Sequence, residues 1–255
     1  HRFGGMWGNN YGTYHHNLIA HNESRNRRWA SGSGYNDYRN NVIYNWDYQS
    51  CYGGEKRQPG DSGFDFTTIN MVANYYKPGP ATDKEVRDRI VEPSARSKDD
   101  KGKWYVADNY VEKAPQVNTN NWKGVDEENY IKMNNPWSAM PINQESPQEA
   151  YHAVLEDAGC SLPNRDAIDL RIIEEVRNGI AIYGNKGIIN KPGDVGGWPK
   201  LDSAPPPVDS DHDGMPDKWE KKKGLDPNSA GDRNDVASDG YTMLEKYLNS
   251  LIDSR

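Results

Sequence analysis

A short apolar motif that recurs along the first half of the chain limits the possible folds more than any other feature. The first copy, Asn17-Leu-Ile-Ala-His21-Asn22, places three apolar residues between polar ones. Four copies occupy 17–22, 41–46, 70–75 and 104–109, so their starts lie 24, 29 and 34 residues apart. Short strands at irregular spacing are typical of a solenoid whose coils differ in loop length. We therefore predict a parallel β-helix with ladders of stacked polar residues, while a β-sandwich, which usually has closer and more regular strands, is the alternative.

Two helices are expected after the repeats end. Ser146 to Glu149 offers an N-cap, a proline at the first helical position and an acid three residues after the cap, and Gly159 supplies a stop. A second amphipathic segment runs from about Asp166 to Gly179. We expect both helices to cover a flank or an end of the solenoid.

An acidic loop near the C-terminus has the spacing of an EF-hand calcium loop, with acids at loop positions 1, 3, 5, 9 and 12 and glycine at position 6. Calcium is the expected ion because it prefers several oxygen ligands, whereas a merely solvated acidic turn would leave the acids repelling one another. We assign this site a structural role. The predicted ligands are Asp209, Asp211, Asp213, Met215 through its carbonyl, Asp217 and Glu220, with Asp226 and Asp232 as further candidates.

These features divide the chain into three expected segments. Residues 1–135 form the β-helix coils, and residues 136–204 form a helical and loop-rich cover that ends in a linker rich in glycine and proline. Residues 205–255 form a small EF-hand-like calcium-binding module.

Charge and composition exclude two classes of partner. The net charge of −7 over 255 residues includes no basic excess, so a nucleic-acid partner has no electrostatic support. No apolar run approaches the roughly 18 residues of a membrane span.

The 16 Tyr and 8 Trp, against 3 Phe, suit either a groove that binds sugars or a polar scaffold. Cys51 and Cys160 could form a disulfide or remain two buried thiols.

Three arginines, Arg25, Arg27 and Arg28, follow the first repeat directly in an otherwise acidic chain. Arginine pairs with carboxylates through forked hydrogen bonds, so an acidic polysaccharide is a reasonable ligand. Surface salt bridges within the protein are the simpler interpretation of these residues taken alone.

Several motifs together resemble bacterial pectate lyases of polysaccharide lyase family one, and the resemblance spans nearly the whole chain. The chain would correspond to the C-terminal part of such an enzyme, and the segment 193–199 with the calcium loop after it resembles the end of one. The matching motifs are Gly4-Gly-Met-Trp-Gly8, His15-His-Asn17, Ser24-Arg-Asn-Arg-Arg28, Ser50-Cys-Tyr-Gly-Gly54 and Asn74-Tyr-Tyr-Lys-Pro-Gly-Pro80.

The resemblance implies a right-handed parallel β-helix that cleaves polygalacturonate, the backbone of pectin, by calcium-assisted β-elimination. In this family an arginine removes the proton at C5 and the glycosidic oxygen at C4 leaves. The matching position here is Arg25, while Arg28 matches an arginine that faces the substrate, and either His1 or Arg2 lies near the place of a substrate-binding lysine. The sequence departs from the family motif at Arg27, where the family has proline, and at Ala30, where some members have another arginine.

The family takes its catalytic calcium ligands from coils before the arginine, yet Glu23 is the first acid of this chain. We therefore expect an N-terminal segment of the same protein to supply them. A polymeric substrate implies a secreted, cell-surface or periplasmic protein of a bacterium. A non-catalytic β-helix that binds acidic polysaccharide is the alternative, and a hydrolase would need paired acids that Asp47, Asp61 and Asp65 do not obviously provide.

Overall fold

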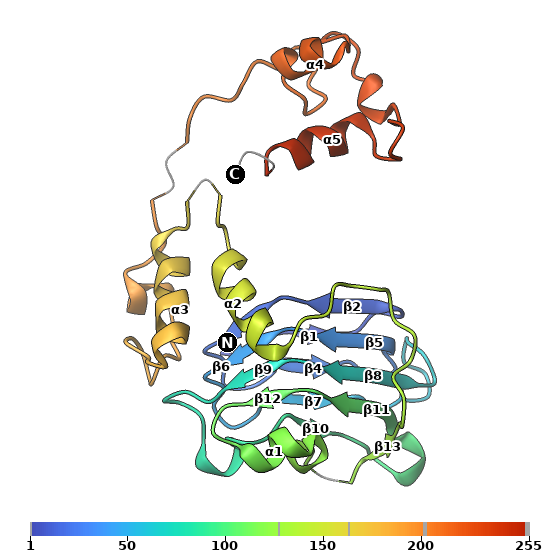
Figure 1. The fold of residues 1–255 in the computed structure, drawn as a ribbon, viewed down its shortest axis with the longest axis vertical. Helices are drawn as coiled ribbons and strands as arrows, with labels where there is room; N and C mark the ends of the chain where they lie inside the picture. Colours follow the sequence, from blue (N-terminus) through green and yellow to red (C-terminus); the bar gives the residue numbers. More distant parts are fainter. Residues whose placement is uncertain (1, 127, 163, 201–202, 253–255) are drawn as a thin grey trace. The chain divides into compact units, whose positions relative to one another are not determined.

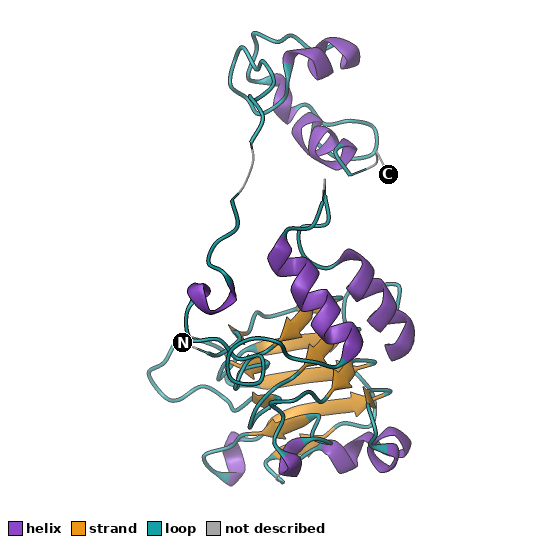
Figure 2. Ribbon diagram, turned by 90° about the vertical axis from the view of Figure 1, so that its left-hand side faces the viewer, coloured by secondary structure: helices purple, strands orange, loops and turns teal. Residues whose placement is uncertain are grey.

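The computed structural model describes residues 2–126, 128–162, 164–200 and 203–252. The chain divides into two compact units, His1–Pro199 (unit 1) and Lys200–Arg255 (unit 2). Unit 1 contains the sheets, and unit 2 consists of short helices and turns (Figure 2). Within the described part of the chain, no helix is both long and apolar enough to cross a membrane.

The strands of unit 1 form three sheets in which every pairing is parallel. The chain visits the three sheets in turn, so that strands of successive coils stack on one another (Figure 1). This arrangement fits the predicted parallel β-helix. The first sheet contains β1 (Met6–Trp7), β4 (Arg27–Trp29), β7 (Cys51–Gly53) and β10 (Val91–Pro93); the second contains β2 (Gly12–His15), β5 (Gly34–Arg39), β8 (Thr67–Val72), β11 (Gly102–Ala107) and β13 (Tyr130–Lys132); the third contains β3 (Leu18–Ala20), β6 (Val42–Tyr44), β9 (Tyr75–Lys77) and β12 (Tyr110–Val111).

The space inside the coils is filled by apolar and aromatic side chains. Along several of the short strands, buried and half-buried side chains alternate, because successive side chains of a strand point to opposite faces. In β4, β7 and β10 the first and third residues are buried and the middle one is half-buried. The largest members of this core are Trp29, Tyr38, Ile43, Trp46, Ile69, Met71, Tyr76, Ile90 and Trp104.

A ladder of asparagines runs through the bend between the second and third sheets. The side-chain Nδ2 of Asn17 donates to Oδ1 of Asn41 at 2.8 Å, and the same bond joins Asn41 to Asn74 and Asn74 to Asn109, each at 2.9 Å. In each coil the residue before the ladder asparagine has a positive φ, between 52° and 60°, which turns the chain out of one sheet and into the next. The predicted polar ladder is therefore confirmed.

The register of the repeats differs from the expected one in two places. The motifs at 17–22 and 41–46 begin at ladder residues, as expected. The motifs at 70–75 and 104–109 instead begin inside β8 and β11, and the ladder residues are Asn74 and Asn109 near their ends. Each coil contains two short apolar strands that meet at a polar bend, so an apolar motif alone does not tell which of the two strands it marks.

Both predicted helices are present, and they pack on the third sheet. Helix α2 (Pro147–Asp157) begins with a capping box between Ser146 and Glu149, and α3 (Ala167–Asn178) ends at Gly179 in the left-handed conformation. Their apolar side chains form a second core with the outer face of the third sheet; its buried members are Val42, Tyr44, Tyr75, Val154, Leu155, Ile173 and Val176. The helices therefore cover a flank of the coils.

The remaining elements of unit 1 are short. They are α1 (Pro115–Thr119) and four 3₁₀ turns, η1 (Lys84–Val86), η2 (Lys98–Asp100), η3 (Asn121–Gly124) and η4 (Pro192–Val195). The two cysteines form no disulfide, because Cys51 is a buried thiol inside the coils and Cys160 is exposed beyond α2.

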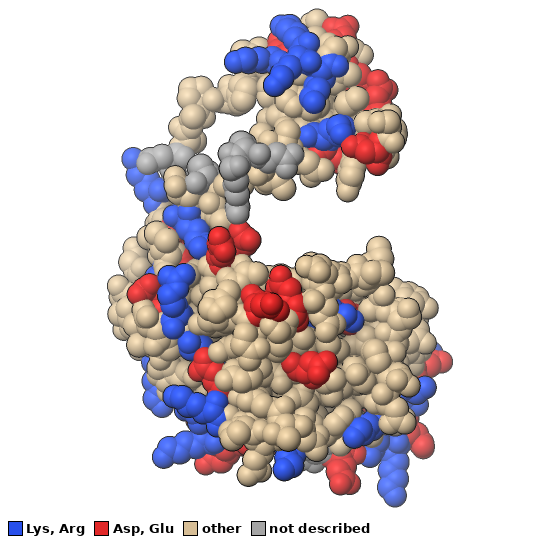
Figure 3. Space-filling view, viewed as in Figure 1, with Lys and Arg blue, Asp and Glu red and all other residues tan. Residues whose placement is uncertain are grey.

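Unit 2 contains α4 (Asp217–Lys223), η5 (Asp232–Asn234) and α5 (Met243–Ser250). Trp219 of α4 lies edge-on to Tyr247 of α5, with ring centroids 5.4 Å apart. Figure 3 shows Lys and Arg side chains gathered over α4, whose last turn is basic and so complements the helix dipole. In the described part of unit 2 the buried apolar side chains are those of Met215 and Pro227, so this unit has almost no apolar core.

Candidate functional site

One face of the first sheet points away from the core and carries a row of polar side chains. Alternation along β4 buries Arg27 and Trp29 and leaves Arg28 half-buried. The strand register places Arg28 beside Tyr52 of β7, and Tyr52 beside Glu92 of β10. We call Arg28, Tyr52 and Glu92 the outer row.

Arg25 lies at the bend that leads into β4. Its φ of 57° is in the left-handed region, which is uncommon for residues other than glycine. Its carbonyl oxygen accepts a hydrogen bond from the backbone N–H of Gly5 at 2.9 Å. Its guanidinium carbon lies 5.0 Å from the centre of the Phe3 ring, and no carboxylate among the described residues pairs with it. The backbone of Arg25 is therefore held, while its guanidinium has no acid beside it in the described part of the chain.

Arg28, in contrast, is fully engaged inside the protein. Its Nη2 lies 2.5 Å from Oε1 of Glu55, and its Nη1 lies 3.0 Å from Oε2 of the same carboxylate. Nη1 also donates to the carbonyl oxygen of Trp29. Glu55 could not be identified from the sequence, because it lies in the next coil and faces Arg28 only once the coils are stacked.

The other arginines around this face are also paired with acids. Nη2 of Arg2 lies 3.0 Å from Oε1 of Glu23. Nη1 of Arg89 lies 2.8 Å from Oε2 of Glu92, and Arg89 contacts Asp126 as well. Of the three arginines predicted to act on substrate, Arg2, Arg25 and Arg28, the structure leaves only Arg25 without a carboxylate partner among the described residues.

Arg27, at the position where the family motif has proline, lies inside the coils. Burial lowers the pKa of its guanidinium, which is surrounded by aromatic rings. The π faces of such rings attract a cation and partly replace the missing carboxylate. These rings belong to Trp7, Tyr14, Trp29 and Tyr38. Arg27 is thus a core residue, and it does not reach the outer row.

The acids near Arg25 do not converge on a point where a cation could bind. Glu23 is paired with Arg2, and the pKa of Asp47 is raised by burial and by the nearby carboxylates of Asp83 and Glu23. Within the described residues, both groups of three carboxylates whose oxygens lie within 4.8 Å of one another are in unit 2.

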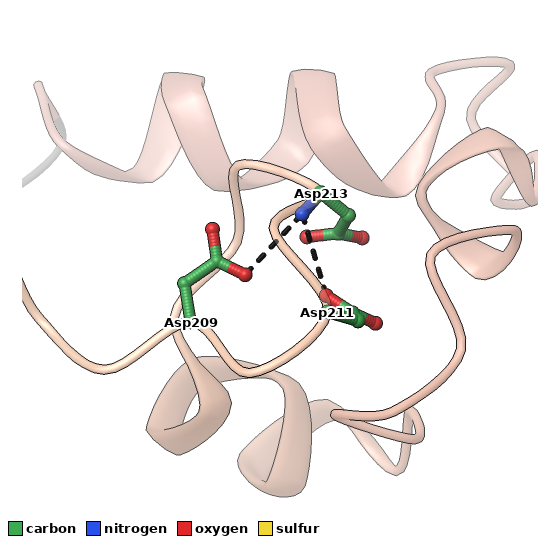
Figure 4. A group of neighbouring side chains, drawn as sticks. All are labelled: Asp209, Asp211 and Asp213. Atoms are coloured by element: carbon green, nitrogen blue, oxygen red, sulfur yellow. Dashed lines mark hydrogen bonds between the residues drawn. The ribbon is translucent and has the colours of Figure 1, made fainter.

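The acidic loop of unit 2 is folded around its first three aspartates (Figure 4). The backbone N–H of Asp213 donates to Asp209 at 3.2 Å and to Asp211 at 3.3 Å. Gly214 has a φ of 97°, as the predicted turn requires, and its N–H donates to Asp209 at 3.1 Å. The carboxylates of the three aspartates form one of the two groups just described.

The other predicted ligands have different surroundings. Met215 is buried, and its N–H donates to Asp213 at 2.7 Å. Asp217 accepts hydrogen bonds from the N–H and the hydroxyl of Ser210, at 2.8 and 2.9 Å. Glu220 is 0% exposed, and burial together with the surrounding aspartates raises the pKa of its carboxyl to about 7.

Asp232 joins Asp213 and Glu220 in the second group of carboxylates. It follows Glu220 by twelve residues, outside the loop motif, and so the sequence offered it only as one of two further candidates. The signal that could have favoured it is weak, since acids are frequent throughout unit 2.

Comparison with curated proteins finds relatives over most of the chain. It is 34% identical over 245 residues to a protein of Aspergillus terreus named probable pectate lyase C, and 34% identical over 247 residues to a protein of the same name from Aspergillus flavus. Both alignments cover 93% of this chain and 53% of the relative. A third protein of that name, from Emericella nidulans, is 34% identical over 242 residues, which are 92% of this chain and 51% of the relative. No family model matches the chain.

The chain thus spans about half the length of the curated relatives it matches. These relatives are fungal, whereas the sequence motifs pointed to bacterial lyases, so the similarity supports the enzyme class and not a bacterial source. Motifs and alignments agree in one respect: the chain is similar over more than nine-tenths of its length to part of proteins named as pectate lyases.

Proposed function

We propose that this chain is the C-terminal part of a pectate lyase, folded as a right-handed parallel β-helix, and that Arg25 is its catalytic base. The observation that carries the proposal is that the Arg25 guanidinium pairs with no carboxylate among the described residues, while Arg2, Arg28 and Arg89 are each held by acids. The similarity to proteins named pectate lyase supports the same reaction class.

The proposed reaction is a β-elimination on a polygalacturonate chain. Arg25 removes the proton at C5, which is acidified by the adjacent uronate carboxylate. The C5–H electron pair forms the C4–C5 double bond, the C4–O bond breaks, and the leaving oxygen takes up a proton. General base catalysis needs a group that can reach the proton and hold the correct protonation state, and an arginine without a carboxylate partner is easier to deprotonate than one in an ion pair.

Arg28 and Arg2 are proposed to bind the uronate carboxylates. Arg28 lies on the outer row two coil strands from Glu92, and its forked pair with Glu55 fixes its orientation. Arg2 is more exposed and is held by Glu23. A sugar carboxylate would share these guanidinium groups with Glu23 and Glu55. Each arginine would therefore bind the sugar less strongly than an arginine without an acid partner.

The described residues around Arg25 do not supply the ligands of a catalytic calcium ion. We therefore propose that an N-terminal segment of the same protein supplies them, as the sequence led us to expect. The first strands β1, β2 and β3 each pair on one side only within the described chain, so their other edges are free to pair with further coils. The greater length of the relatives is consistent with this proposal.

Calcium is also proposed to bind the EF-hand-like loop of unit 2, in a structural role. The donor set fits a hard cation, because Asp211, Asp213 and Glu220 each have a buried carboxylate oxygen with no hydrogen-bond donor among the described residues. A pectic substrate is a polymer too large to enter a cell, so we propose that the protein acts as a secreted, cell-surface or periplasmic enzyme.

The test is the release of unsaturated oligogalacturonates, followed by their ultraviolet absorbance, from polygalacturonate with calcium present. In a protein that includes the upstream segment, Arg25→Ala is expected to lower kcat by about two to four orders of magnitude. Arg177→Ala, on the exposed side of α3, is the matched control and should retain full activity. Full activity of Arg25→Ala would rule out the proposed base.

A second candidate function is a non-catalytic β-helix that binds acidic polysaccharide. The positions of the acids favour it, because both groups of three carboxylates found among the described residues lie in unit 2, which leaves no such group beside Arg25 in the described part of unit 1. Polygalacturonate that is retained by the full-length protein but never cleaved would favour this function over the lyase.

A further inference from the structure

We propose that Asp232 completes the cation site of unit 2 from outside the twelve-residue loop, so that the bound ion ties η5 and α5 to the loop and α4. The inference rests on the proposed calcium loop and extends it, because it identifies a ligand that the loop motif does not contain. It also gives the ion a specific task, which is to compensate for the very small apolar core in the described part of unit 2.

The two carboxylate groups of unit 2 share one residue. Asp209, Asp211 and Asp213 form the first group, and Asp213, Glu220 and Asp232 form the second. Within each group the potential ligand oxygens lie within 4.8 Å of one another, as expected for ligands of one ion. Because Asp213 belongs to both groups, the five carboxylates surround a single region.

Burial provides the independent evidence for a cation. Glu220 is 0% exposed and Asp213 is 2% exposed. Both oxygens of Glu220 are buried without a hydrogen-bond donor among the described residues, and the same is true of one oxygen each of Asp211, Asp213 and Asp232. Carboxylates are almost never buried without a partner, since losing water without compensation is very costly for a charge. A divalent cation would satisfy all of these oxygens at once.

The structure also separates Asp232 from the other candidate, Asp226. The Oδ1 of Asp226 accepts hydrogen bonds from the backbone and side chain of Asn228, at 3.1 and 3.3 Å. The Oδ2 of Asp232 accepts the backbone N–H of Asp226 at 3.0 Å, which leaves its buried Oδ1 for the ion. Asp226 therefore positions Asp232 and is not itself a ligand.

A second contact brings the same short helix to the loop. Nη1 of Arg233 donates to the backbone carbonyl of Asp213 at 3.1 Å. Two consecutive residues of η5 thus face the loop, one through a carboxylate and one through a guanidinium. Since α5 has no buried residue, it is joined to the rest of the unit by the Trp219–Tyr247 ring pair and by hydrogen bonds such as that from the N–H of Met243 to the carbonyl of Asp235, at 2.9 Å.

The experiment is a titration of the full chain with CaCl₂, followed by calorimetry and by amide hydrogen exchange of residues 203–252. Asp232→Asn is expected to weaken calcium binding by at least about tenfold and to remove the calcium-dependent protection of α5. The variant can still accept the N–H of Asp226 through its amide oxygen, so the local fold is retained. Asp226→Asn is the matched control and should bind calcium within about twofold of the wild type.

The outcomes separate this inference from the loop on which it rests. If Asp232→Asn binds calcium like the wild type while Glu220→Gln does not, the loop binds calcium but Asp232 is not a ligand, and the inference is wrong. If the unmodified chain binds no calcium, both the loop and the inference are wrong. MgCl₂ in place of CaCl₂ should give much weaker protection, because five carboxylates crowd the smaller ion.

Discussion

The two units of this chain bury polar groups in opposite ways. In unit 1 the buried Asn41, Asn74 and Asn109 form a ladder with Asn17 in which each coil supplies a donor or an acceptor to its neighbour, and the buried Arg27 is surrounded by aromatic rings. In unit 2 the buried polar groups are carboxylates, and several of their oxygens meet no donor within the described residues. A ladder is complete when the chain alone has folded, whereas a cluster of like charges needs an ion from solution. If unit 2 binds calcium as proposed, unit 1 carries its own stability and unit 2 draws part of its stability from the ion.

The two units also differ in the size of their apolar cores, in agreement with the difference in their buried polar groups. Unit 1 fills its coils with large aromatic and aliphatic side chains and adds a second core beneath α2 and α3. In the described part of unit 2, Met215 and Pro227 are the buried apolar residues. Small folds without a sufficient core usually rely on metals or disulfides, and neither cysteine lies in unit 2.

Removal of calcium is expected to have the largest effect on the difference between the two units. Chelation by EGTA should unfold unit 2, because an ion present at a thousand times its Kd contributes about 4 kcal/mol that is then lost. Unit 1 should keep its stability. Hydrogen exchange of the full chain measures both units in one sample, and equal protection of residues 203–252 with and without EGTA would contradict the comparison.

The converse change breaks the ladder of unit 1. Asn74→Ala removes the acceptor for the N–H and the Nδ2 of Asn41 and the donor to the carbonyl of Tyr38. Each buried group left without a partner costs about 1 to 3 kcal/mol, so we expect a loss of about 3 to 5 kcal/mol in the unfolding free energy of unit 1.

Urea denaturation followed by tryptophan fluorescence measures that loss, and Asn134→Ala, at an exposed asparagine, is the control. Calcium affinity should be unchanged in both variants. A loss of calcium binding in Asn74→Ala would mean that the units are not independent in the sense proposed here.

The ladder also shows how far the sequence could lead. The repeated motif, the polar bends and both capped helices were predictable, because strand alternation and helix caps are local signals. The positions of Asn74 and Asn109 in the ladder were not, since loops of unequal length shift each coil relative to the last. Pairs that form across coils, such as Arg28 with Glu55, leave no signal along the chain.

The same limit applied to the candidate sites. The loop from Asp209 to Glu220 was predictable because its ligands follow one another at fixed spacing. Asp232 joins them only through the fold of the turn that precedes η5. Among the described residues no acid pairs with Arg25, and only the structure shows this, because the sequence places Glu23 close to Arg25 and does not indicate that Glu23 pairs with Arg2.

His21 provides a test of unit 1 by pH. Its ring contacts Asn45 through Nδ1 at 2.9 Å, and its Nε2 lies 2.9 Å from Oε2 of Glu175, which also binds Arg171. Asn45 presents an N–H group, so a second ring proton on Nδ1 would meet another donor. Burial, with a smaller contribution from the charge of Arg171, lowers the pKa of His21 to about 4.

Because the unfolded chain takes up this proton near pH 6.5 and the folded chain only near pH 4, the unfolding free energy should fall as the pH drops between these values, by up to about 3 kcal/mol. Urea midpoints at several pH values measure the loss. His21→Asn places in this coil the residue that the next coil has at position 45, and it should show a smaller loss over the same range. Identical pH dependence of the two proteins would show that His21 is not responsible.

The smallest and most closely matched test uses the two capping boxes, one in each unit. Ser146 caps α2 with Glu149, and Thr242 caps α5 with Glu245 in the same geometry. Replacing either cap by alanine removes about 1 kcal/mol of local helix stability.

In unit 1 that loss should appear directly as lower unfolding free energy, because α2 is packed on the third sheet. In unit 2 it should appear as calcium affinity weaker by about fivefold in Thr242→Ala, since the ion must then also order a less stable helix. Ser146→Ala should leave calcium affinity unchanged, and a calcium affinity of Thr242→Ala equal to that of the wild type would show that α5 folds independently of the ion.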